Sequence, residues 1–184
     1  MSEFDSQLWK NRAWARYTHA LCSGQPLQKI EPEWAHDILA IGDLDLLTRW
    51  CTERKVTVDF VKKQCGTYYS GTKAITISSR LSPRNQVIVL LHECGHHLIG
   101  PSGDSDRFQM GYAQVDHEIT KTFHHRVSCL EEEMEAWHRG WRLSCRLALR
   151  VDREVFDEYR LKCLKSYIKW TIKPGKFDFP KLEL

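Results

Sequence analysis

The sequence predicts an α+β fold in which a small antiparallel or mixed sheet of about three strands packs on one helix, with additional helices towards both ends. Segments 56–60 and 74–78 alternate apolar and polar residues and are rich in β-branched side chains, which is typical of strands. Segment 83–99 carries its apolar residues at helical spacing, and the segments before and after this region show the same period.

Length and composition indicate one domain. The chain has 184 residues, of which 42% are hydrophobic and 28% charged, as in a globular protein with a single core. We therefore expect one domain over 1–184, with a helical N-terminal part (1–52), a core (53–150) and a C-terminal helix and tail (151–184). The net charge is only +3 and no long basic run occurs, so a nucleic-acid partner is not indicated.

The cysteines and the N-terminal residues bear on the cellular location of the protein. Seven cysteines are scattered without a CxxC pair, a pattern typical of reduced thiols rather than of a disulfide framework. We therefore expect a cytoplasmic protein. The N-terminus lacks the apolar core of a leader peptide, and no apolar run reaches the roughly 18 residues that a membrane span requires. Neither export nor a membrane partner is expected.

Helices are predicted before the first strand, and a hairpin after it. Residues 5–22 have helical spacing, and Pro32 opens a second helical stretch that Gly42 is expected to divide into two short helices. Between the two strands, Ser70 and Gly71 are expected at the tip of a hairpin turn.

The later elements have clearer boundaries. Ser82 as N-cap and Pro83 at the first helical position predict a helix over 83–99, which Gly100 is expected to end in a left-handed conformation. A surface loop and two further helices complete the prediction; they are expected over 101–115, 128–150 and 152–172. Three arginines, Arg142, Arg146 and Arg150, recur every four residues and predict a solvated helical face.

The helix over 83–99 contains an HExxH motif, written HECGH here. His92 and His96 lie one turn apart on nearly the same face, so both rings can bind one metal ion. Glu93 is rotated about 100° from His92, from where its carboxylate can reach a water on that ion and act as a base. Cys94 and His97 are turned away from the pair. The motif therefore predicts a Zn²⁺ site with a built-in base.

A catalytic zinc site usually has three protein ligands and one open position. Segment 131–141 offers Glu133, with Ala136 and Gly140 on the same helical face, so this face can approach another helix closely. We expect Glu133 to be the third ligand. Glu132 is the alternative, because a shift of one residue in the phase of this helix would exchange the two.

The segments ITISSRLSPRNQVIVLLHECGHHLIG and EEEMEAWHRG resemble the ImmA/IrrE family of zincin-like metallopeptidases, over roughly residues 55 to 145. The resemblance implies a minimal zincin-like fold. It also implies that His92, His96 and Glu133 bind zinc and that Glu93 is the general base. In one respect the chain departs from the pattern: Trp137 stands where related sites often have Asn or Asp, so a partner that orients the ligands is missing or comes from elsewhere.

These features together predict a zinc-dependent metallopeptidase that hydrolyses peptide bonds in a protein or peptide substrate. In zincins an edge strand typically receives the extended substrate, and the strand at 73–78 is expected to do so here. The candidates for stabilising the oxyanion are Tyr112, His117, His124, His125 and His138.

Two alternatives come from other classes of protein. The first is a non-catalytic zinc module that binds a partner such as a transcription regulator, although the intact Glu93 favours an enzyme. The second is a SprT-like protease that acts on DNA-bound proteins. That family usually has a histidine as third ligand, and the weak basicity of this chain gives it little support.

Overall fold

The computed structural model describes residues 32–62, 66–100 and 122–173. The predicted helix over 5–22 and the predicted loop over 101–115 lie outside these ranges. In chain order the elements are α2 (Pro32–Glu53), β1 (Thr57–Val61), β2 (Thr67–Tyr69), β3 (Ala74–Ser78), α3 (Pro83–Ile99), α4 (Phe123–Arg146) and α5 (Arg153–Ile172).

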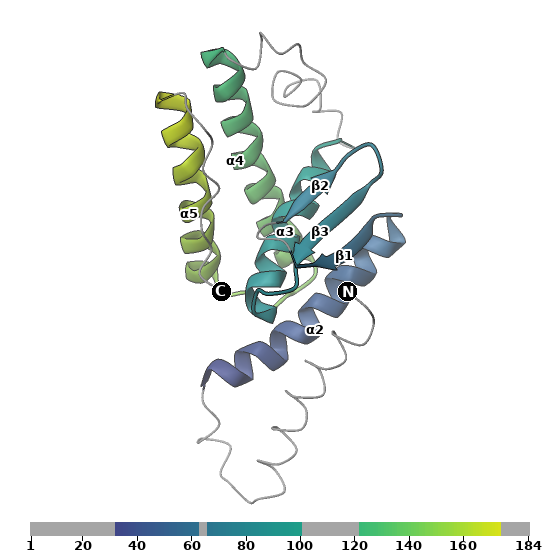
Figure 1. The fold of residues 1–184 in the computed structure, drawn as a ribbon. Coiled ribbons are helices and arrows are strands. Elements are labelled where there is room, and N and C mark those ends of the chain that lie inside the picture. Colours follow the sequence, from purple (N-terminus) through teal and green to yellow (C-terminus); the bar gives the residue numbers. More distant parts are fainter. Residues whose placement is uncertain (1–31, 63–65, 101–121, 174–184) are drawn as a thin grey trace, which may run out of the picture.

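The three described strands form one mixed sheet in the order β1-β3-β2. β3 pairs in parallel with β1 and antiparallel with β2. The sheet packs on α3, which also contacts α2 and α4, and α5 packs on the outer side of α4 (Figure 1). The α+β prediction with a small mixed sheet is therefore confirmed, and α3 is the central element.

The core lies between β3 and the helices. Ile75 and Ile77 alternate with more exposed residues along β3 and are both fully buried. On α3, Leu90, Leu91 and Cys94 are fully buried as well, on the apolar side of the helix. The period of two in the strand and the helical period in α3 thus bring two apolar faces together.

α2 is one continuous helix, so the predicted break at Gly42 is wrong. Glycine costs about 1 kcal/mol relative to alanine inside a helix, which tertiary packing can outweigh. Leu47 and Cys51 of α2 are fully buried in the core. A Cβ atom at Gly42 would lie only 3.3 Å from Nη2 of Arg150, so the glycine leaves room for that side chain.

α3 begins as predicted and ends differently. The Ser82 hydroxyl accepts a hydrogen bond from the backbone N–H of Asn85, and Pro83 occupies the first turn. Gly100 has φ −57° and ψ −56°, which is right-handed, so the predicted left-handed cap is wrong. Instead, Nη1 of Arg139 on α4 donates to the carbonyl oxygen of Leu98 over 2.6 Å. A side chain from a neighbouring helix satisfies this end.

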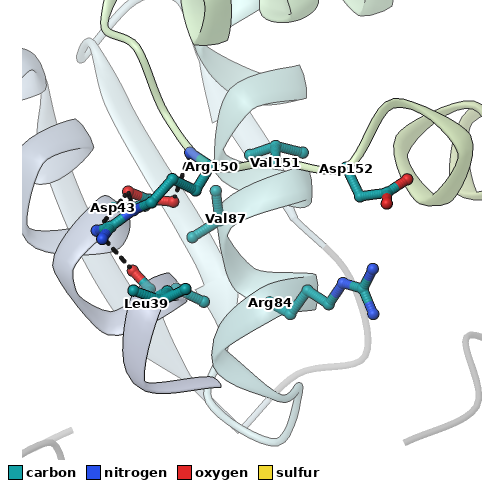
Figure 2. A pocket seen from close by; sticks show the side chains of 8 residues that line it. Leu39, Asp43, Arg84, Val87, Arg150, Val151 and Asp152 are labelled. Carbon is teal, nitrogen blue, oxygen red and sulfur yellow. Dashed lines mark hydrogen bonds and ion pairs between the residues drawn. The ribbon is translucent and has the colours of Figure 1, made fainter. Parts of the chain in front are cut away.

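The last two helices form as predicted, with one correction. α4 starts five residues earlier than expected and ends at Arg146, so Arg150 is not on the predicted arginine face. Arg150 instead lies after the helix and forms an ion pair with the buried Asp43 of α2, at 3.2 Å (Figure 2). Asp152 caps α5 by accepting hydrogen bonds from two backbone N–H groups. Within the described ranges, no helix combines the length and apolar character needed to cross a membrane.

Candidate metal centre

The backbones of α3 and α4 touch where the two helices cross. A Cβ atom added to Gly95 would lie 1.9 Å from the carbonyl oxygen of Ala136, and one added to Gly140 would lie 2.5 Å from that of Leu91. Only glycine fits at these two positions without moving a backbone. The prediction that Ala136 and Gly140 allow close approach is therefore confirmed, and Gly95 of the HECGH motif is the matching residue on α3.

This close crossing brings three polar side chains together. Nε2 of His92 lies 3.2 Å from Oε2 of Glu133, and Nε2 of His96 lies 3.4 Å from Oε1 of the same carboxylate. The two Nε2 atoms are 3.3 Å apart. One possible ligand atom from each residue thus lies within 4.8 Å of the others. The structure groups Glu133, rather than Glu132, with the two histidines.

The spacing of the two histidine nitrogens fits a zinc ion. In a tetrahedron with metal–ligand distances of about 2.0–2.1 Å, neighbouring ligand atoms are about 3.3 Å apart. The two histidine Nε2 atoms are 3.3 Å apart, which matches one such edge, whereas the separations of 3.2 and 3.4 Å lead from them to two different oxygens of Glu133. Two imidazole nitrogens and one carboxylate oxygen are also a donor set that zinc accepts in catalytic sites. The residues present therefore fit a zinc ion.

The charges of the group favour an ionised carboxylate. Burial alone would raise the pKa of Glu133, but the facing His96 and His92 outweigh it and hold this pKa well below its usual range. Burial would lower the pKa of His96, yet Glu133 and Glu132 raise it well above its usual range. A metal ligand has to be deprotonated, and Glu133 meets that condition.

Glu132 orients His96 from the other side of the ring. Its Oε1 lies 3.2 Å from Nδ1 of His96, as an acceptor for the Nδ1–H tautomer. In the neutral ring, a proton on Nδ1 leaves the lone pair of Nε2 directed at His92 and Glu133. A carboxylate on the far nitrogen of a histidine ligand fixes the ring and raises its basicity. Glu132, the alternative third ligand, thus takes an orienting position.

His92 is held differently. Its ring stacks on Trp137, with the centroids 4.2 Å apart and the planes inclined by 21°. Nδ1 of His92 is buried and has no hydrogen-bond partner among the residues that the structure describes. At the position where an Asn or Asp was anticipated from the resemblance, the indole therefore supplies a flat packing surface in place of a hydrogen bond.

The structure adds one residue that the sequence did not reveal. The hydroxyl group of Tyr167 on α5 donates a hydrogen bond to Oε1 of Glu133 over 2.9 Å. Tyr167 lies on the face of α5 that also carries the buried Tyr159 and Thr171, so helical spacing indicates its inward orientation. No local pattern indicates that its partner is Glu133.

Glu93 is buried beside the group, between α3 and β2. Burial raises the pKa of Glu93, while His92 and His96 partly offset this and the backbone of Tyr68 hydrogen-bonds the carboxylate. A Cβ atom at Gly66 would lie 2.8 Å from Oε1 of Glu93, so the start of β2 runs directly against the carboxylate. The start of β2 thereby confines the candidate base.

Cys94 and His97 face away from the group, as predicted. Sγ of Cys94 lies 3.4 Å from Sγ of Cys51 on α2. Nδ1 of His97 lies 3.0 Å from the hydroxyl oxygen of Tyr68. Both residues belong to the packing of α3 against its neighbours.

Three of the five candidates for the oxyanion group lie within the described residues. Tyr112 and His117 lie outside the described residues. His124 and His138 are exposed on α4, whereas His125 is buried on the same helix.

The prediction that the strand at 73–78 is an edge strand is wrong. β3 occupies the middle of the described sheet, with β1 and β2 on its two sides. The hairpin turn places β2 on the outer side, where its backbone contacts Glu93. The described edge strand beside the candidate base is therefore β2.

Comparison with protein-family models, curated protein sequences and solved structures finds no match. The resemblance of the HECGH and EEEMEAWHRG segments to the ImmA/IrrE family stays a prediction. The geometry of the site is what supports a function.

Proposed function

We propose that the protein is a zinc-dependent metallopeptidase. The observation that carries this proposal is the convergence of His92, His96 and Glu133, whose possible ligand atoms lie within 4.8 Å of one another, with Glu93 next to His92 in the chain. A zinc ion in such a site supplies an activated water and polarises the scissile carbonyl group. The zincin-like fold and the relation to ImmA/IrrE proteins are part of the same proposal.

Glu93 is the proposed general base. It takes the proton of the attacking water and delivers it to the leaving amine. The pKa of Glu93 is raised by burial, which moves a carboxylate towards the range in which it accepts a proton efficiently near neutral pH. His92 and His96 hold the ligand positions, and Glu132 keeps Nε2 of His96 directed at them.

We propose an extended peptide segment as the substrate. Edge strands bind extended peptides through backbone hydrogen bonds, and β2 is the described edge strand whose backbone touches Glu93. A peptide added along β2 would pass the base. The free thiols of the described cysteines favour a cytoplasmic setting, so the enzyme should be assayed under reducing conditions.

Metal analysis and peptidase assays of four variants test the proposal. His92→Ala, His96→Ala and Glu133→Ala should each lower the zinc content, whereas Glu93→Gln should keep zinc and lose hydrolysis. Full hydrolysis by Glu93→Gln would contradict the role of the base. A purified wild-type protein that takes up no zinc would remove the proposal altogether. A zinc-loaded Glu93→Gln variant with full biological effect would instead indicate a non-catalytic binding module.

A further inference from the structure

The carboxylate of Glu133 has two oxygens with different surroundings. Oε2 faces Nε2 of His92, whereas Oε1 faces Nε2 of His96 and also accepts the hydrogen bond from Tyr167. A glutamate side chain has three rotatable bonds, and ordering such a chain costs up to about 2 kcal/mol of entropy. A donor at a fixed place selects the one orientation in which both oxygens face the histidines.

Tyr167 can be such a fixed donor because α5 is attached to α4 at both ends. Near the start of α5, Phe156 is fully buried with its ring 5.4 Å from that of Trp137. Near its end, Nε of Arg126 donates to the carbonyl oxygen of Thr171 over 3.3 Å. Tyr167 lies between these two attachments, one turn before Thr171.

The chemistry of the contact fixes the direction of the hydrogen bond. An ionised carboxylate only accepts, so the phenol has to donate. The phenol therefore leaves Glu133 charged and restricts where its oxygens point.

We propose that Tyr167 is a positioning residue that aims Glu133 at His92 and His96, so that the metal centre extends to α5. The inference rests on the proposed metal site, and Tyr167 lies beyond the segment that resembles the ImmA/IrrE family. Partners of this kind commonly change metal affinity by about 10- to 100-fold. Tyr167 thus determines how tightly the site holds its ion.

The test compares Tyr167→Phe with Tyr159→Phe, which removes another buried tyrosine hydroxyl from the same helix and keeps the ring. Zinc affinity is measured on folded protein by competition with a chromophoric chelator, and the coordination of Co²⁺ by its absorption spectrum. Tyr167→Phe should weaken zinc binding about 10- to 100-fold and alter the Co²⁺ spectrum, while Tyr159→Phe should do neither. Equal affinity of Tyr167→Phe and the wild type would overturn the inference and leave the proposed function standing.

A double-mutant comparison separates positioning from a general effect on the fold. With Glu133→Ala already present, Tyr167→Phe should weaken zinc binding no further, because its target is gone. An equal loss in both backgrounds would show that Tyr167 acts without Glu133.

If Tyr167→Phe fails to fold, zinc is added to the Tyr159→Phe variant. Zinc binding should perturb the absorption of Tyr167 in the ultraviolet difference spectrum of this variant. No tyrosine perturbation would overturn the inference. A wild type that binds no zinc would instead refute the proposed function.

Discussion

Each of the three grouped side chains is held by a neighbour of a different chemical kind. His96 has the carboxylate of Glu132 on its Nδ1, and His92 has the indole ring of Trp137 against its face. Glu133 accepts from a phenol. A hydrogen bond fixes both the tautomer and the orientation of an imidazole, whereas a stacked ring restrains only its plane. The tautomer and orientation of the His92 ring are therefore less firmly fixed than those of the His96 ring.

Glu132→Ala should weaken zinc binding about 10- to 100-fold without abolishing it, because His96 loses the acceptor that fixes its tautomer. Titration against a chromophoric chelator measures this. Glu131→Ala, which removes an exposed carboxylate from the adjacent position, is the matched control and should bind like the wild type. Complete loss of zinc in Glu132→Ala, together with retention in Glu133→Ala, would show that Glu132 is the ligand.

Gly66→Ala should reduce peptide hydrolysis on the order of 100-fold while zinc content stays near one ion per chain, because the new methyl group displaces Glu93. The added Cβ would lie 2.4 Å from Cγ1 of Val89 and 2.8 Å from Oε1 of Glu93. Gly71→Ala is the control, since nothing lies within 4 Å of a Cβ atom there. Wild-type turnover by Gly66→Ala would mean that β2 does not constrain the base.

At the level of elements, the crossing of α3 and α4 is what assembles the site. The three grouped side chains come from two helices that are separated by more than twenty residues of chain, and they meet only because the backbones touch. Gly95 and Gly140 allow that contact from opposite sides. The glycine within HECGH thus has a packing role in addition to its place between the two histidines.

Gly95→Ala should push the helices apart, with a cost in unfolding free energy of about 1–3 kcal/mol and a loss of bound zinc. Urea unfolding of the metal-free protein and metal analysis measure the two effects. At Gly100, near the end of the same helix, a Cβ atom would meet nothing within 4 Å and φ is −57°. Gly100→Ala should therefore leave stability and zinc content unchanged. A stable, zinc-replete Gly95→Ala protein would contradict the proposed crossing.

The boundaries of the elements differ in how far local residues decide them. Ser82 and Pro83 define the start of α3 through a capping hydrogen bond and a restricted φ angle, which both act locally. The continuity of α2 through Gly42 depends instead on the packing of its buried face and on Arg150, more than a hundred residues away. The end of α3 likewise depends on Arg139 of α4.

For the whole molecule, a bound ion would join the two halves of the described fold. His92 and His96 belong to α3, which packs on the sheet and α2, whereas Glu133 belongs to α4, which packs on α5. Because a preformed set of ligands is absent from the unfolded chain, the free energy of metal binding adds to that of folding.

Zinc should raise the free energy of unfolding by about 2.7 kcal/mol at a free concentration one hundred times the Kd, and chelation should remove this gain. Thermal unfolding with and without a chelator measures it. In His92→Ala the chelator should have little effect, because one of the three ligands is missing. An equal response to the chelator in both proteins would place the stabilising ion elsewhere.

The sequence by itself determined the features that depend on neighbouring residues: the α+β class, the span of α3, the hairpin before β3, and the common face of His92 and His96. The tertiary structure decided which strand lies at the edge, which of Glu132 and Glu133 joins the histidines, and that Tyr167 contacts Glu133. Spacing along one helix sets directions within that helix. Contacts between helices depend on how closely their backbones approach and on their relative rotation, which only the packed fold defines.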